Sequence, residues 1–515
     1  MSNAATHMPL TSAQTLILPA DAHNRSLVDN VHPLNWVNPT PAGRYNLVVL
    51  GAGTAGLVSA AGAAGLGAKV ALVERHLMGG DCLNFGCVPS KGLLRGARAA
   101  YDAREAEVFG IGMPDSISFD FCSAMERMRR LRANISEHDS AHRLSKLGVD
   151  VFFGAAKFVA RDAVEVGGQT LLFSRAVIAT GTRPATPAIA GLAGTGFLTN
   201  ETVFSLTELP RRLAVIGAGP VGCELAQAFR RFGSQVFLFT RGSRLLPRED
   251  ADAASVVAGQ FDREGIRIAL GSKILRAEKQ NGAQVLVFQR DDQEDRVVAD
   301  EILVAVGRAP NVEGLELHTA AVAFDNRGVK VDDHLRTSNR RMYAAGDICS
   351  AYKFTHVADA TARVVLQNAL FFGRKKASAL VIPWCTYTDP EVAHVGLYEK
   401  EARERGLDLT TLTVPLKEVD RAVLDGDENG FARVHAEKRS GRILGATLVA
   451  RHAGEMISEI SLAITAGVGL GTLAKTIHPY PTQAEAWKRL GDDWNRSRLT
   501  PRLRNFFERY LRWRR

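Results

Sequence analysis

Several features are scarce in this sequence, and each scarcity removes a class of protein. Only six cysteines occur in 515 residues, too few for the disulfide framework of a small secreted protein. The 47 glycines show no three-residue period, which excludes collagen. Because 46% of the residues are apolar and the net charge is only +9, disorder is not expected. The length predicts several domains with ample buried core.

The sequence also offers no clear targeting or membrane-spanning segment. The first 43 residues lack a basic stretch followed by a long apolar run, so we expect no signal peptide and a cytoplasmic protein. Residues 45–68 are uncharged and long enough to span a bilayer. They are rich in Gly and Ala, however, and carry a phosphate-binding spacing. Residues 1–43 are left open as an ordered arm or a loose leader.

A dinucleotide-binding pattern begins directly after the apolar run LVVL. Gly51, Gly53 and Gly56 have the spacing G-x-G-x-x-G, and an Ala/Gly-rich helix and the strand VALVE follow. Glycine there permits a tight turn, backbone contact with a pyrophosphate and close packing of helix on strand. Glu74 ends the second strand, where a carboxylate can hold a ribose diol. The alternative, a merely tight helix–strand packing, explains the acid less well.

The same pattern recurs at Gly217, Gly219 and Gly222, again after a strand. Two dinucleotide sites in one chain suggest electron transfer between two nucleotides. At the second site the position of the acid is occupied by Thr240, and Arg241 follows. Arginine can bind a 2′-phosphate, so the sequence favours NADPH, with NADH as the alternative.

The segment GGDCLNFGCVPSK, residues 79–91, contains two cysteines whose spacing indicates redox chemistry. Cys82 and Cys87 lie five residues apart at the start of a predicted helix, whose N-terminus favours a thiolate. A disulfide can close there if the first turn is distorted. The alternatives are two inert buried cysteines or a metal pair, but no second cysteine pair at zinc spacing exists. Between two nucleotide sites, a redox-active disulfide is the favoured interpretation.

With these motifs in order, residues 44–490 resemble the class I pyridine nucleotide–disulfide oxidoreductases, which include glutathione reductase, dihydrolipoyl dehydrogenase and mercuric reductase. The resemblance implies FAD at the first site, NAD(P)H at the second and a homodimer formed through the C-terminal domain. The fold class expected is α/β, with two Rossmann-like dinucleotide-binding domains of the glutathione reductase type and a C-terminal α+β dimerisation domain. The expected segments are an N-terminal arm (1–43), an FAD-binding domain (44–182 and 310–380), an NAD(P)H-binding domain (183–309), an interface domain (381–490) and a basic amphipathic helix (491–515).

The resemblance also assigns site residues. FAD would be held by Gly51, Gly53, Gly56, Glu74, Gly80, Lys91, Thr180, Gly181, Gly346 and Asp347. NADPH would be held by Gly217, Gly219, Gly222, Arg241 and Gly307. Lys91 and Glu224 would form an ion pair beside the flavin. Cys87 would face the flavin as a thiolate, Cys82 would react with the substrate, and the partner subunit's His478 would carry the proton.

Departures from the family pattern bear on the substrate. Five residues after His478 stands Gln483 where a glutamate is usual, so His478 is expected to lack its carboxylate. Asp81 replaces a common threonine, without an explanation from the sequence, and Pro220 stands where glutathione reductase has an aromatic residue. Within the family, residues 79–91 and the NADPH signature resemble mercuric reductase, but no cysteine follows Cys385 to hand over a metal. The other four cysteines, 122, 223, 349 and 385, are expected to be buried and structural.

The C-terminal tail is the remaining unusual feature. Residues 491–515 hold eight arginines and three acids, which is +5 of the net +9. Apolar residues recur at helical spacing between the arginines. Such a helix suits an anionic membrane at its inner face or an acidic partner; the alternative is a helix docked on the dimer. No nucleic-acid-binding motif occurs in the body, so no nucleic acid is expected.

Together with the motifs, the resemblance implies an FAD-dependent oxidoreductase that passes electrons from NAD(P)H through flavin to a Cys82–Cys87 disulfide and on to a disulfide or a metal ion. No resident metal site is expected. One alternative is reduction of a quinone or another acceptor by the flavin itself. The other is a redox-sensing flavoprotein that acts through its basic tail.

Overall fold

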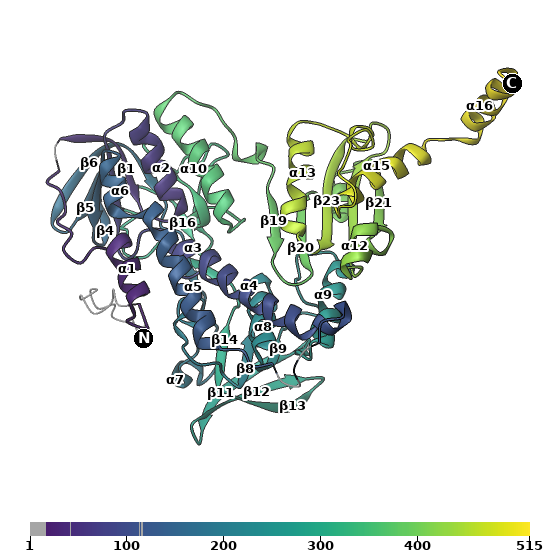
Figure 1. The fold of residues 1–515 in the computed structure, drawn as a ribbon. Helices are drawn as coiled ribbons and strands as arrows, with labels where there is room; N and C mark the ends of the chain where they lie inside the picture. The colour runs from purple at the N-terminus through teal and green to yellow at the C-terminus, as the bar shows by residue number, and fades with distance from the viewer. Residues whose placement is uncertain (1–16, 42, 113, 115–116) are drawn as a thin grey trace.

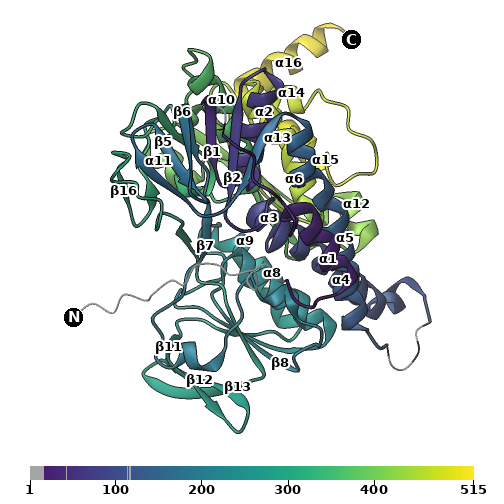
Figure 2. The same cartoon turned by 90° about the vertical axis from the view of Figure 1, so that its left-hand side faces the viewer.

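Three bodies, each built on its own β-sheet, organise the computed structural model, which describes residues 17–41, 43–112, 114 and 117–515. Figure 1 shows the first body at the left, the second below it and the third at the right, with the last helix extending away from the third. Figure 2 shows the same arrangement from the side. The predicted fold class, two Rossmann-type units and a dimerisation domain, is confirmed.

The first body is a seven-stranded sheet in the order β3–β2–β1–β6–β5–β4, with β18 also paired to β6. Helices α2 and α10 cover one face, so that its apolar strands are buried between layers. The strands are β1 (Arg44–Leu50), β2 (Val70–Glu74), β3 (Val149–Phe153), β4 (Ala156–Ala160), β5 (Ala163–Val166), β6 (Gln169–Ile178) and β18 (Met342–Ala344), and the helices are α2 (Thr54–Gly65) and α10 (Thr355–Leu370).

The second body interrupts the first. The chain leaves through β7 (Thr182–Pro184) and returns through β15 (Arg308–Pro310), and these two strands pair antiparallel. Between them lies a parallel sheet, β10–β9–β8–β14, beside an antiparallel one, β11–β12–β13. Its elements are β8 (Arg212–Ile216), α8 (Pro220–Phe232), β9 (Gln235–Phe239), α9 (Ala251–Arg263), β10 (Arg267–Ala269), β11 (Lys273–Gln280), β12 (Ala283–Arg290), β13 (Gln293–Ala299) and β14 (Glu301–Val304).

The third body is a five-stranded antiparallel sheet in the order β19–β20–β23–β22–β21. Trp487 and Trp494 of α15 are buried in its core, which fixes that helix firmly to the sheet. The elements are β19 (Pro383–Thr386), β20 (Glu391–Gly396), β21 (Leu409–Pro415), β22 (Phe431–Glu437), β23 (Ile443–Ala450), α13 (Ala453–Thr465), α14 (Leu470–Leu473) and α15 (Glu485–Ser497).

A group of helices joins the first body to the second. It contains α3 (Gly80–Asn84), α4 (Cys87–Arg104), α5 (Phe121–Ser136), α6 (Ala141–Lys146) and the N-terminal α1 (Ala22–Val31). Helix α4 packs between α5 and α8, so one end of it reaches the first body and its side rests on the second. Short elements complete the fold: α7 (Leu192–Thr195), α11 (Glu399–Glu404), α12 (Asp420–Asp425), β16 (Phe324–Asp325) and β17 (Gly328–Val329).

The described part of the N-terminal segment is an ordered arm. Helix α1 packs on α5, and Asp21 accepts a hydrogen bond from Arg129 Nε at 2.5 Å. Arg132, which is 1% exposed, donates both to Asn24 Oδ1 and to the carbonyl oxygen of Asn84 in α3, each at 2.7 Å. Burial lowers the pKa of Arg132 to about 10. The arm is therefore tied to the helix that carries Cys82, while residues 1–16 lie outside the described residues.

The C-terminal segment differs from the expected single helix over 491–515. Residues up to Ser497 belong to α15, and a separate helix, α16 (Pro501–Trp513), begins after Thr500, whose hydroxyl caps it. No residue of α16 is buried against the described part of its own chain. The alternative of a helix docked on the dimer stays a prediction. Among the described residues, no helix is both long and apolar enough to cross a membrane.

Candidate active site

The first glycine-rich turn joins β1 to α2 and forms one wall of a large cavity. Gly51 has a φ of +97°, and a Cβ on it would lie 2.5 Å from the carbonyl oxygen of Ala179. A Cβ on Gly56 would lie 1.8 Å from the carbonyl oxygen of Gly51, and one on Gly80 would lie 2.7 Å from the Cα of Gly53. Because Gly51, Gly56 and Gly80 leave no room for a Cβ, the backbone packs closely there, and the N–H groups at the start of α2 can face a phosphate.

Glu74 ends β2 and lines the same cavity. Its carboxylate accepts hydrogen bonds from the backbone N–H of Ala52 at 2.7 Å and of His76 at 2.8 Å. Burial raises the pKa of Glu74, and the two hydrogen bonds oppose that rise. A carboxylate fixed at the end of the second strand is well placed for the hydroxyl groups of a ribose.

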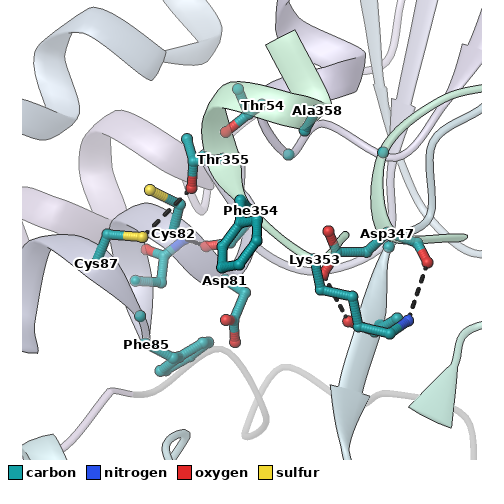
Figure 3. Close-up of a pocket in the computed structure, with 18 of the residues that line it drawn as sticks. Thr54, Asp81, Cys82, Phe85, Cys87, Asp347, Lys353, Phe354, Thr355 and Ala358 are labelled. Atoms are coloured by element: carbon teal, nitrogen blue, oxygen red, sulfur yellow. Dashed lines mark hydrogen bonds between the residues drawn. The ribbon is translucent and has the colours of Figure 1, made fainter. Parts of the chain in front are cut away.

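Asp347 lies further along the cavity, just after β18. Its carboxylate accepts a hydrogen bond from Thr182 Oγ1 at 3.0 Å, and burial raises its pKa. Lys353 donates to the backbone carbonyl of Asp347 at 3.2 Å (Figure 3). The structure places further predicted contacts along the same wall, namely Thr180, Gly181 and Gly346.

The cavity has a volume of about 810 Å³ and lies between the first glycine-rich turn, α3, α4, α8 and the start of α10. This volume falls within the range of cofactor sites. A turn that has no room for a Cβ at Gly51 or Gly56, a fixed carboxylate at one end and Asp347 further along together fit FAD. When bound, FAD would supply the chemistry of hydride acceptance and disulfide reduction.

The second glycine-rich turn, between β8 and α8, repeats this geometry. A Cβ on Gly217 would lie 2.4 Å from the carbonyl oxygen of Ala305, and one on Gly222 would lie 1.9 Å from that of Gly217. Nothing lies within 4 Å of a Cβ on Gly219 or on Gly307, so a ligand can approach the backbone there. Arg241 is exposed just beyond the end of β9.

Cys82 and Cys87 lie side by side at one end of the cavity (Figure 3). Cys82 lies in α3 and Cys87 begins α4, with a break at Gly86 between the two helices where the sequence predicted one distorted helix. Both are free thiols in the structure, as in the reduced form of such a pair. Cys87 Sγ lies 3.3 Å from the hydroxyl oxygen of Thr355, the first residue of α10.

The two thiols have opposite acidities. The pKa of Cys87 is lowered to about 6, against the effect of burial, by a hydrogen bond from the Cys82 thiol first and then by Thr355 and the positive charge of Lys91. The same interaction and burial raise the pKa of Cys82. The reduced pair therefore holds one proton at neutral pH, with the negative charge on Cys87 facing the cavity.

Lys91 lies one turn after Cys87 and pairs with Glu224 of α8, with 2.8 Å between Nζ and Oε2. Burial lowers the pKa of Lys91, but the nearby carboxylate of Glu224 raises it by more, so the pKa of Lys91 is raised overall. Glu224 also accepts a hydrogen bond from the backbone N–H of Tyr387, whose ring lies 4.5 Å from the Lys91 ammonium. The pair thus joins the redox helix to the second and third bodies.

The comparison with protein families decides what this arrangement is. The family model described as "Pyridine nucleotide-disulphide oxidoreductase" matches residues 45–362, and that of its dimerisation domain matches residues 382–490. The chain belongs to this family. It is an FAD-dependent enzyme of the pyridine nucleotide-disulfide oxidoreductase type, and its dimerisation domain supports a homodimer.

Known relatives are similar over almost the whole family region. A mercuric reductase of Lysinibacillus sphaericus is 34% identical over 464 residues, covering 90% of this chain and 84% of the relative. A dihydrolipoyl dehydrogenase of Bacillus subtilis is 30% identical, covering 86% of this chain and 97% of the relative. Among solved structures, the HOCl-induced flavoprotein disulfide reductase RclA from Escherichia coli has a TM-score of 0.78 at 28% identity, covering 87% of this chain and 99% of that chain.

Asp81, which the sequence left unexplained in this oxidoreductase, fixes the turn that carries the cysteines. Its carboxylate accepts a hydrogen bond from Asn200 Nδ2 at 2.8 Å and lies 3.3 Å from Arg308 Nη1. Asn200 also donates to the carbonyl oxygen of Phe85. Asp81 raises the pKa of Cys87 slightly against the effects that lower it. Its role in the structure is therefore to position α3 against the second body.

One of the four remaining cysteines, Cys122, contradicts the expectation of burial, and Cys385 lies at the cavity. Cys223 is buried and Cys349 is partly buried, but Cys122 is exposed on α5. Cys385 of β19 lines the cavity near Lys91, and burial raises its pKa well above the ordinary value. No sequence motif could indicate this position, because Cys385 reaches the cavity through the packing of the third body.

His478 lies in the third body, away from the cavity of its own chain. The carboxylate that the sequence indicated as missing comes from another element: His478 Nε2 lies 3.0 Å from Oε1 of Glu459 in α13. Its Nδ1 lies 3.2 Å from the carbonyl oxygen of Thr476. Gln483 is buried and bonds to Asp427 instead. The expectation that His478 lacks a carboxylate partner is therefore wrong.

Proposed function

We propose that this oxidoreductase passes electrons from NADPH through bound FAD to the Cys82–Cys87 pair and on to a disulfide or a soft metal ion. The observation that carries the proposal is the position of Cys82 and Cys87 side by side at the end of the cavity, with the Thr355 hydroxyl 3.3 Å from Cys87 Sγ and the Lys91–Glu224 pair beside them. Two thiols side by side can reduce a disulfide or bind a soft metal ion as a substrate.

With a disulfide substrate, the sulfur of Cys82 attacks after losing its proton, forms a mixed disulfide and releases one substrate thiolate. The Cys87 thiolate then attacks the sulfur of Cys82, releases the second substrate thiol and closes the Cys82–Cys87 disulfide. Two electrons that originate from NADPH reopen it. The high pKa of Cys82 makes a base necessary, and the partner subunit's His478, oriented by Glu459 in its own chain, is the predicted one.

Anaerobic titration with NADPH tests this proposal. One equivalent should produce two new thiols per chain and a long-wavelength absorption band from the thiolate beside the flavin. A Cys87→Ala variant should retain FAD, yield no such band and lose disulfide reduction. If the flavin bleaches with no new thiols, or if Cys87→Ala keeps full turnover with every acceptor, the disulfide is not in the electron path. Reduction of quinones by the flavin alone, or redox sensing, would then be favoured.

The preference for NADPH rests on Arg241, exposed beyond the end of β9 with no carboxylate at the position after the strand. Arginine binds a 2′-phosphate, and that phosphate is what distinguishes NADPH. Arg241→Ala should lower kcat/KM for NADPH about tenfold or more and leave NADH almost unchanged. Equal losses with both nucleotides would refute this assignment.

The acceptor is proposed at the level of chemical class. Relatives named mercuric reductase favour a metal ion, and relatives named dihydrolipoyl dehydrogenase or disulfide reductase favour a disulfide. Steady-state rates with mercuric ion, copper(II) and small disulfides, each compared between the wild type and Cys82→Ser, would separate them. The rate of reduction of an acceptor that receives its electrons from the Cys82–Cys87 pair should fall in Cys82→Ser.

A further inference from the structure

Helix α16 (Pro501–Trp513) is the part of the chain that the reductase site does not use. It stands apart from the three bodies, at the end of the short connection after α15 (Figures 1 and 2). Helix α15 itself is fixed, because Trp487 and Trp494 are buried in the core of the third body. The structure therefore presents a free helix on a rigid base.

One face of α16 is apolar and lies in solvent. The apolar residues have the spacing i, i+3, i+4, i+7 and i+8, which places them on one side of a helix. The side chains are between 40% and 80% exposed, and they are Leu503, Phe506, Phe507, Tyr510, Leu511 and Trp513. A contiguous exposed apolar face of this kind marks a binding surface.

The rest of α16 is strongly basic. Residues 501–515 contain six arginines and one acid, Glu508, which pairs within the helix with Arg504. At 100° per residue, Arg502 and Arg509 border one edge of the apolar face and Arg504 borders the other. Phe, Tyr, Trp and Leu on one face with arginines along its edges is the pattern of helices that lie in a membrane interface.

A protein partner of this chain's own kind fits the helix poorly. Two α16 helices packed face to face would bring their arginines together. Outside residues 491–515 the chain has a net charge of +4, so overall it adds no negative charge to offset these arginines. An anionic lipid surface satisfies both faces at once, because it accepts the rings and neutralises the arginines.

The length of the helix decides how it would bind. Thirteen residues span about 20 Å, less than the roughly 30 Å hydrocarbon core of a bilayer. We propose that α16 docks the enzyme on an anionic membrane by lying in its interface, with the apolar face toward the acyl chains and the arginines at the phosphates. A homodimer carries two such helices, so both can engage one surface and strengthen attachment.

Flotation of the full-length, FAD-loaded enzyme with lipid vesicles tests this proposal. The enzyme should float with vesicles of phosphatidylcholine and phosphatidylglycerol, should float little with phosphatidylcholine alone, and should be released by high salt. Phe506→Ser should weaken partition about tenfold or more. Arg502→Gln should weaken it about fivefold, on anionic vesicles only. Asn505→Ser, on the polar face, is the matched control and should bind like the wild type.

Soluble turnover and the dimer mass serve as controls for folding, and both should be unchanged in all three variants. The proposal is overturned if the wild type fails to float with anionic vesicles, or if it floats equally well with phosphatidylcholine alone. It is also overturned if Phe506→Ser converts the dimer to a monomer while vesicle partition stays the same. The helix would then belong to a protein interface.

Discussion

Replacing Thr355 with valine removes the hydroxyl group that lies 3.3 Å from Cys87 Sγ while nearly keeping the side-chain volume. A hydrogen bond to a charged acceptor contributes about 1.5–3 kcal/mol, and one pKa unit corresponds to about 1.4 kcal/mol. Because sulfur is a weak acceptor, the lower end applies, and the pKa of Cys87 should rise from about 6 to about 7. At pH 7 the thiolate fraction would fall from about 90% to about half.

The assay is the long-wavelength thiolate–flavin absorption of the two-electron-reduced enzyme, followed as a function of pH. The band comes from the thiolate, so it is present above the pKa of Cys87 and is lost as the pH falls below it. The band of the wild type should therefore disappear below about pH 6 and that of Thr355→Val below about pH 7. Thr355→Ser retains the hydroxyl group and should behave like the wild type. If valine leaves the titration unchanged, or serine shifts it equally, Thr355 does not stabilise the thiolate.

Three further predictions follow from contacts elsewhere in the molecule. Gly56→Ala should abolish FAD retention, measured as flavin absorbance per chain, because its Cβ would lie 1.8 Å from a carbonyl oxygen. Arg132→Met should destabilise the protein by about 2–4 kcal/mol in chemical denaturation, because two buried acceptors lose their donor, whereas exposed Arg130→Met should cost under about 0.5 kcal/mol. Glu459→Gln should lower kcat about tenfold or more if His478 carries the proton, and an unchanged kcat and pH profile would exclude that role.

Features that depend on local backbone geometry could be predicted from the sequence. A strand followed by Gly51-x-Gly53-x-x-Gly56 leaves the chain few ways to fold, because Gly51 takes a positive φ and Gly56 packs against the carbonyl oxygen of Gly51 within the same turn. The same holds for the second turn and for the position of Cys87 at a helix start. The fold class followed from these signals, and the comparisons confirm it.

Contacts made through tertiary packing could not be predicted. Thr355 contacts Cys87 although 268 residues separate them in the sequence. Glu459 of α13 contacts His478, which lies in the loop between α14 and α15. The sequence shows that Gln483 stands where a glutamate is usual. It does not show that Glu459 supplies the carboxylate instead, because no local pattern indicates which surface of α13 faces the loop that carries His478. Likewise, the role of Asp81 depends on its ion pair with Arg308, a residue that is distant in the sequence.

The antiparallel pairing of β7 with β15 has a consequence for how such a chain can arise and be re-engineered. The whole nucleotide-binding insert enters and leaves through neighbouring strands, with Arg183 directly opposite Ala309. An insert whose two ends meet can be exchanged as a unit, since the host fold closes behind it without a gap. Shuffling this cassette between relatives would change the electron donor while the rest of the chain keeps its partner and its acceptor.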